Sequence, residues 1–172
     1  MGMMVLLLTL LAVQVQFAYR RHKLFAQSWD GLLSRVEEVN FAALREVADC
    51  YLMPGKDQLR IEPPQMWAMV GGISGLHKLR HNADVMLQLA TYAERWNLAD
   101  SRVVSAIMRR DAERFRKAAL RMELAVLYPY GVVRANLSLQ EAIAAYCLMR
   151  ERLLGLYQVA HVARIPLLEA AL

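Results

Sequence analysis

The sequence has few cysteines and few prolines, which argues against a disulfide-bonded protein and against a disordered chain. Only two of its 172 residues are cysteine, and Cys50 and Cys147 lie far apart with no paired spacing motif. A disulfide is therefore not expected, and both residues are predicted to be buried as small apolar side chains. The five prolines and a hydrophobic share of 57% favour a folded body with one core over a disordered chain.

Charge is missing from the first stretch of the chain, Met1 to Tyr19, and returns abruptly in Arg20, Arg21, His22 and Lys23. As a helix, this uncharged stretch is about 28 Å long, close to the roughly 30 Å hydrocarbon thickness of a bilayer. A cleavable export signal is the alternative, but it needs a basic residue before the apolar run and small residues at a cut site. The pattern therefore predicts an uncleaved transmembrane anchor.

The basic cluster after this stretch predicts the topology of the chain. Segments rich in Lys and Arg beside a membrane span stay on the cytoplasmic side, so Met1 is expected outside and the rest of the chain in the cytoplasm. We expect Arg20, Arg21 and Lys23 to contact lipid or a partner protein. The predicted domains are residues 1–23, an anchor with a basic flank, and residues 24–172, a helical cytoplasmic domain at the cell inner membrane.

Apolar residues recur at helical spacing through most of the remaining chain. The predicted fold class is all-α, with one N-terminal transmembrane helix followed by a cytoplasmic bundle of about four to five helices. Ser138 with Glu141 forms a capping box for the last helix, and Pro166 is expected to end it. The expected helical regions are residues 24–53, a region that opens at Pro63 and Pro64, 76–96, 102–128 and a last helix that reaches about residue 163.

Three glycines in the second helical region, Gly71, Gly72 and Gly75, each lower helix propensity by up to about 1 kcal/mol relative to alanine. Their spacing places them on one side of a helix, where another backbone can approach closely. We therefore predict a tight helix crossing or a hinge. A phosphate-binding loop is not expected, because no strand pattern precedes the glycines and no Lys-Ser or Lys-Thr pair follows them.

The best candidate for site chemistry is the set His77, His81 and Asp84. Their spacing can aim three metal ligands from one helical face. Lys78 stands where a zinc protease has its glutamate base, so that reaction is not indicated. The alternative interpretation of the three residues is a solvated or partner-facing polar side.

Two isolated histidines, His22 and His161, are candidate axial ligands for haem or a chlorophyll-type pigment, because a neutral imidazole offers a nitrogen to a metal. The sequence has no Cys-x-x-Cys-His attachment motif. No cofactor is therefore predicted.

The helix expected from residue 102 to about 128 carries a basic stripe formed by Arg110, Arg114, Lys117 and Arg121. Its apolar side is predicted to include Val103 and Ile107, among others. The stripe is either a solvated charged face or a contact surface for anionic lipid or an acidic partner. Nucleic acid is not expected as a partner, because no aromatic residues for base stacking alternate with the stripe.

The segment from Met66 to Trp96 resembles uncharacterised bacterial proteins that have one N-terminal span and a helical cytoplasmic body. The similarity is greatest over Val70 to Leu76 and His81 to Ala90. It covers less than a third of the chain, and it implies no activity and no functional residues.

The first functional hypothesis is a non-catalytic accessory subunit of a larger membrane protein complex. Its anchor contacts membrane lipid, and its helical body packs on the cytoplasmic face of the complex, which we hypothesise to be an energy-converting photosynthetic or respiratory assembly. The protein is not expected to be an enzyme or to have a small-molecule substrate. The alternatives are a metal- or cofactor-binding membrane protein that uses His77, His81 and Asp84, and a membrane-tethered regulator that binds acidic lipid or protein through its basic helix.

Overall fold

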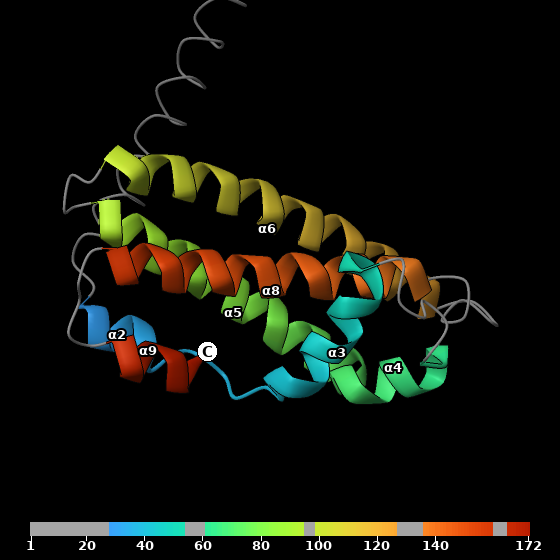
Figure 1. Cartoon of the computed structure of the whole chain (residues 1–172). Coiled ribbons are helices and arrows are strands. Elements are labelled where there is room, and N and C mark those ends of the chain that lie inside the picture. Colours follow the sequence, from blue (N-terminus) through green and yellow to red (C-terminus); the bar gives the residue numbers. More distant parts are fainter. Residues whose placement is uncertain (1–27, 54–60, 95–98, 127–135, 160–164) are drawn as a thin grey trace, which may run out of the picture.

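A computed structural model of the chain describes residues 28–53, 61–94, 99–126, 136–159 and 165–172. Every regular element in these ranges is an α-helix (Figure 1), so the all-α prediction is confirmed for this part of the chain. The helices are α2 (Trp29–Leu33), α3 (Phe41–Leu52), α4 (Pro63–Val70), α5 (Gly72–Ala93), α6 (Ala99–Val126), α8 (Asn136–Val159) and α9 (Ile165–Ala171).

The predicted transmembrane helix is not supported, and the fold class is corrected to an all-helical fold. Among the helices in the described ranges, none is both long enough and apolar enough to cross a bilayer. The longest, α6, has 28 residues but carries basic side chains along its length, and α8 carries the charged run Arg150, Glu151 and Arg152. The predicted anchor, residues 1–23, and the predicted domain boundary after it lie outside the described residues.

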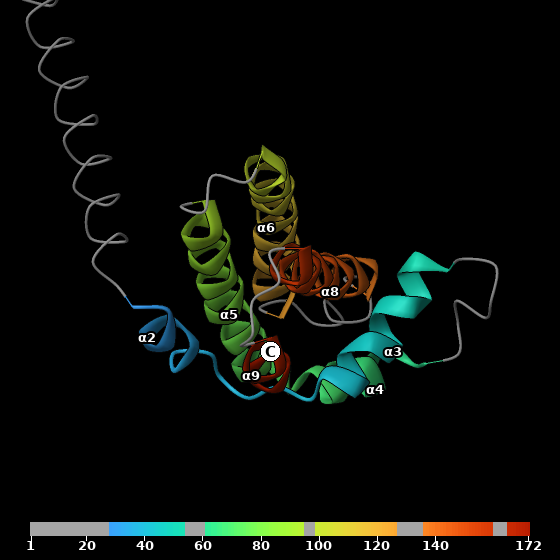
Figure 2. The ribbon, with the colours of Figure 1, turned by 60° about the vertical axis from the view of Figure 1, so that its left-hand side comes forward.

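Helix α8 lies at the centre of the fold. It contacts α3, α5, α6 and α9, and Figure 2 shows α5 and α6 on one side of it and α3 on the other. Every residue from Leu139 to Cys147 except Glu141 is buried, which is typical of a helix that is covered on nearly every side. The short helix α2 contacts α5, and α4 contacts both α3 and α5.

Several helices begin at residues with a clear local preference for that position. The Ser28 hydroxyl and the Asn40 amide oxygen each accept a hydrogen bond from a backbone N–H three residues later, at 3.1 Å, and so cap α2 and α3. Pro63 and Pro64 occupy the first positions of α4, as predicted, because a helix leaves those N–H groups without partners.

The single helix predicted from residue 24 to about 53 is wrong, because residues 34–40 separate α2 from α3. These residues are called the α2–α3 linker below. The backbone of Glu37 finds its hydrogen-bond partners in the side chain of Asn82, on α5, instead of in a helix turn. This long-range contact offsets the local preference for helix.

The C-terminal boundaries also differ from the prediction. Helix α8 begins at Asn136, so Ser138 is not its N-cap, and Glu141 accepts a hydrogen bond from Arg121 at 2.8 Å. Pro166 does not end a helix but occupies the second position of α9, where a missing N–H costs nothing.

The two cysteines are free and buried, as predicted. Cys50 lies on α3 and Cys147 on α8, and the two helices pack against each other. Both thiols therefore belong to the core.

Candidate functional site

The structure gives His77, His81 and Asp84 three separate polar contacts. The His77 Nε2 atom lies 3.6 Å from Glu123 Oε1, and Asp84 forms an ion pair with Arg116. The His81 Nε2 atom lies 3.0 Å from the carbonyl oxygen of Arg35; because a carbonyl oxygen only accepts, Nε2 donates its proton there and is not available to a metal. Over the described ranges, no group of three or more His, Cys, Asp or Glu side chains is placed to hold a metal ion.

Five other residues singled out in the sequence fall outside the part of the chain that the structure describes. They are His22 and His161, considered as axial ligands, and Arg20, Arg21 and Lys23, considered as lipid or partner contacts. Their roles stay predictions.

Side chains of α5 hold the α2–α3 linker in place. Asn82 is fully buried; its Oδ1 accepts from the Glu37 N–H at 2.8 Å and its Nδ2 donates to the Glu37 carbonyl at 2.7 Å. One turn and a half further along α5, Gln88 accepts from the Arg35 guanidinium at 2.9 Å. Together with His81, these contacts make the polar side of α5 a fixed support for the linker. No sequence pattern indicated this role for Asn82.

Gly71 and Gly72 form a sharp turn between α4 and α5, and Gly75 lies in the first turn of α5. Gly71 and Gly72 have φ values of 83° and 65°, a left-handed conformation that glycine adopts without a steric penalty. A Cβ atom at Gly75 would overlap the carbonyl oxygen of Val70. The two backbones that come close together are therefore those of α5, at Gly75, and of the end of α4, at Val70.

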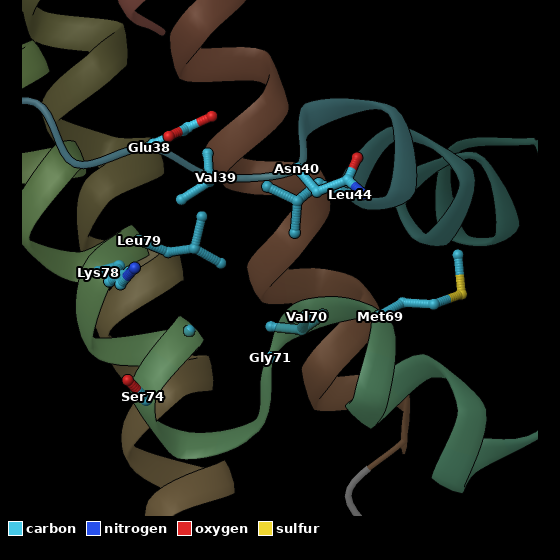
Figure 3. Close-up of a pocket in the computed structure, with 11 residues that line it drawn as sticks. Glu38, Val39, Asn40, Leu44, Met69, Val70, Gly71, Ser74, Lys78 and Leu79 are labelled. Carbon is cyan, nitrogen blue, oxygen red and sulfur yellow. The ribbon is translucent and has the colours of Figure 1, made fainter.

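A cavity of about 230 Å³ lies between this turn, the α2–α3 linker, α3 and α5 (Figure 3). Apolar side chains make up much of its wall, including Leu44, Val70 and Leu79. Its polar groups come from different elements, with Glu38 on the linker and Lys78 on α5. Both are exposed, so the cavity has a solvated, mixed rim.

The solvent-exposed side of α6 is the second candidate site. We call the residues that form a continuous stripe along it the outer face of α6. They are exposed along nearly the whole helix, and the spacing between them alternates between four and three residues. The outer face of α6 consists of Val103, Ile107, Arg110, Arg114, Lys117, Arg121 and Leu124.

The apolar ends of this face are the part that the sequence did not predict. Val103 and Ile107 were expected on the apolar core side, but they are 60% and 38% exposed. Leu124 is 51% exposed at the other end, and Leu120 beside it is 54% exposed. The basic stripe is thus flanked by exposed apolar side chains at both ends.

The four basic residues differ in how far they are neutralised. Within the described ranges, Arg110 and Lys117 form no ion pair, whereas Arg121 pairs with Glu141 at 2.8 Å. Arg114 is 3.9 Å from the carboxylate of Asp111. That carboxylate is buried and also pairs with Arg152 of α8, which leaves Arg114 largely available.

A second cavity, of about 330 Å³, opens beside the outer face of α6. Tyr51 and Leu52 at the end of α3 form one wall, and Ala144 and Leu148 of α8 also line it. Arg114 belongs both to the wall of this cavity and to the outer face. The two features are therefore parts of one surface.

No protein-family model, no curated protein and no solved structure matches the chain.

Proposed function

We propose that the chain is a non-catalytic accessory subunit that binds a larger protein assembly through the outer face of α6. The observation that carries this proposal is the exposure of Val103, Ile107 and Leu124 in line with four basic residues. Single exposed apolar residues are normal on a protein surface, but here they lie at both ends of a line of basic side chains, and this combination on one helix face supports an interaction site.

The contacts of the other polar side chains support the same assignment. His81 and Asn82 hold the α2–α3 linker, His77 lies beside Glu123 of α6, and Asp84 forms an ion pair with Arg116 of the same helix. These side chains have structural partners within the described part of the chain, whereas Arg110 and Lys117 on the outer face of α6 have no ion pair there and lie in line with exposed apolar residues.

Site-specific photo-crosslinking tests the proposal directly. A photoreactive amino acid is placed at Ile107 or at Leu124 in the full chain, and adducts formed in cells are identified by mass spectrometry. We expect both positions to give the same partner protein, because they lie on one face. Ile73, on α5, is the matched control, since it is similarly exposed at 40% but lies off that face.

Native electrophoresis under mild conditions gives an independent test. The wild-type chain is expected to migrate with an assembly larger than itself, and the double variant Val103→Asp with Leu124→Asp is expected to migrate alone. Leu137→Asp is the control, because Leu137 is 66% exposed on α8 and lies outside the face. A free wild-type monomer, with no adduct from Ile107 or Leu124, would contradict the proposal.

A further inference from the structure

The outer face of α6 has the residue spacing of a helix-pairing seam. Residues 103, 107, 110, 114, 117, 121 and 124 alternate steps of four and three, which is the repeat that keeps one line of side chains facing a second helix. Helix α6 has 28 residues and is therefore about 42 Å long. The seam extends along most of that length.

The chemistry along the seam changes from its ends to its middle. Val103 and Ile107 form an apolar end, and Leu124 with the neighbouring Leu120 forms the other. Between them, all four seam positions are basic. A helix that lies along this seam therefore meets apolar side chains at its two ends and positive charge at its centre.

We propose that the partner segment is an amphipathic helix of another protein, apolar at both ends and acidic in its middle. This inference rests on the proposed function and adds the chemistry of the partner. Arg110 and Lys117 form no ion pair in the described part of the chain, so two acidic side chains gain partners there without breaking an existing contact. Charge complementarity of this kind sets both the choice and the register of a helix partner.

The same charges argue against a second copy of this chain as the occupant. Two antiparallel seams centred on Arg114 place that residue opposite its own copy and Arg110 opposite Lys117. A parallel pair places each basic residue opposite itself. Like charges that face each other across an interface disfavour both arrangements.

Designed peptides test the proposal with the full chain. Three helical peptides of 28 residues share apolar residues at both ends and differ only at four central seam positions, which are Glu, Gln or Lys. Fluorescence anisotropy measures their affinity. We expect the Glu peptide to bind at least about tenfold more tightly than the Lys peptide, with a preference that weakens as salt is added.

A charge swap on the protein provides the decisive comparison. The variant Arg110→Glu with Lys117→Glu leaves two acidic and two basic side chains at the central seam positions, so it is expected to abolish the preference, with the Glu and Lys peptides binding about equally. The control variant Lys78→Glu with Arg102→Glu makes the same change in net charge at exposed positions off the seam and is expected to keep the wild-type preference. Circular dichroism of each variant verifies that the helical fold is retained.

Three outcomes overturn the inference. The first is equal binding of the Glu and Lys peptides to the wild-type chain, or a preference that survives the charge swap. The second is binding to phosphatidylglycerol vesicles that the charge swap abolishes and the Glu peptide does not displace, which identifies lipid as the occupant. Crosslinks from Ile107 and Leu124 to a protein without an acidic helix also refute the inference, while they still support the proposed accessory function.

Discussion

The side-chain amide of Asn82 pairs with both backbone groups of Glu37, a residue 45 positions earlier in the chain. The two hydrogen bonds, at 2.8 and 2.7 Å, replace the helix partners that Glu37 lacks. The Asn82 Nδ2 atom also lies 3.4 Å from the hydroxyl of Tyr146 on α8. One buried amide therefore connects the α2–α3 linker, α5 and the central helix.

Replacement of Asn82 by alanine is expected to destabilise the protein by about 2–3 kcal/mol, because it removes two linker hydrogen bonds and leaves backbone polar groups unpaired. Urea unfolding followed by circular dichroism measures the change. Asn40→Ala is the control, since it removes an exposed helix cap and is expected to cost about 1 kcal/mol. A loss at Asn82 no larger than that at Asn40 would show that the linker is not held in this way.

The turn between α4 and α5 is expected to be intolerant of a methyl group at Gly75. Gly75→Ala would place Cβ on the carbonyl oxygen of Val70, and an overpacked site of this kind typically costs about 1–3 kcal/mol. Gly155→Ala is the matched control on α8, because a Cβ there meets no atom within 4 Å. That control should raise stability by about 0.5–1 kcal/mol through better helix propensity. Thermal unfolding of both variants is the measurement, and equal melting temperatures would contradict the prediction.

The ion pair of Asp111 with Arg152 is expected to contribute more to the free energy of unfolding than the ion pairs on the surface. The Asp111 side chain is 4% exposed, so its removal leaves a partly buried arginine without a partner. We expect Asp111→Ala to cost about 3 kcal/mol. Arg45→Ala breaks the exposed pair with Glu151 and should cost less than about 1 kcal/mol. Denaturant titrations of the two variants measure the loss of unfolding free energy in each. Similar losses for Asp111→Ala and Arg45→Ala would contradict the prediction.

Stability is expected to fall at alkaline pH because three buried acids of α8, Tyr146, Cys147 and Tyr157, resist ionisation. Desolvation by burial raises the pKa of Tyr146 from 10.0 to about 12, although its contact with Asn82 partly opposes the shift, and burial raises the pKa of Cys147 from 9.0 to about 12. Burial also raises the pKa of Tyr157. Since these groups lose their protons more easily in the unfolded chain, stability is constant below about pH 9 and is lost as the pH rises toward 12.

Denaturant titrations between pH 8 and pH 12 measure this dependence. In the variant Cys147→Ala, the loss caused by these groups is expected to begin nearer pH 10, because the two tyrosines that remain have an ordinary pKa of 10.0, against 9.0 for the thiol. Lys78→Gln, at an exposed position, is the control. It should leave unchanged the pH at which stability begins to fall. An unfolding free energy that stays flat from pH 9 to pH 12 would refute the prediction.

Local signals in the sequence predicted much of the helical fold. Pro63 and Pro64 marked the start of α4, and the end predicted near Met53 agrees with the last residue of α3, Leu52. The helix expected from residue 102 to about 128 is α6 with bounds shifted by two or three residues. Each of these features depends on residues close together in the chain.

Features that depend on distant residues were not predicted. The break at the α2–α3 linker needs Asn82, and the same apolar spacing that indicates helix cannot show which of two opposite apolar sides is buried. On α6, Met108, Phe115 and Met122 are fully buried, whereas Val103 and Ile107 face solvent. Only the packing of α6 on α5 and α8 distinguishes the two sets.

The position of α8 at the centre of the fold has a consequence for synthesis of the chain. Helices α3, α5 and α6 all precede α8 in the sequence, yet each of them packs against it. While the ribosome is still making α8, the apolar sides of these earlier helices have no common surface to cover them. Their apolar sides are therefore exposed to aggregation until the stretch through Val159 has emerged, when α8 can pack against all three helices.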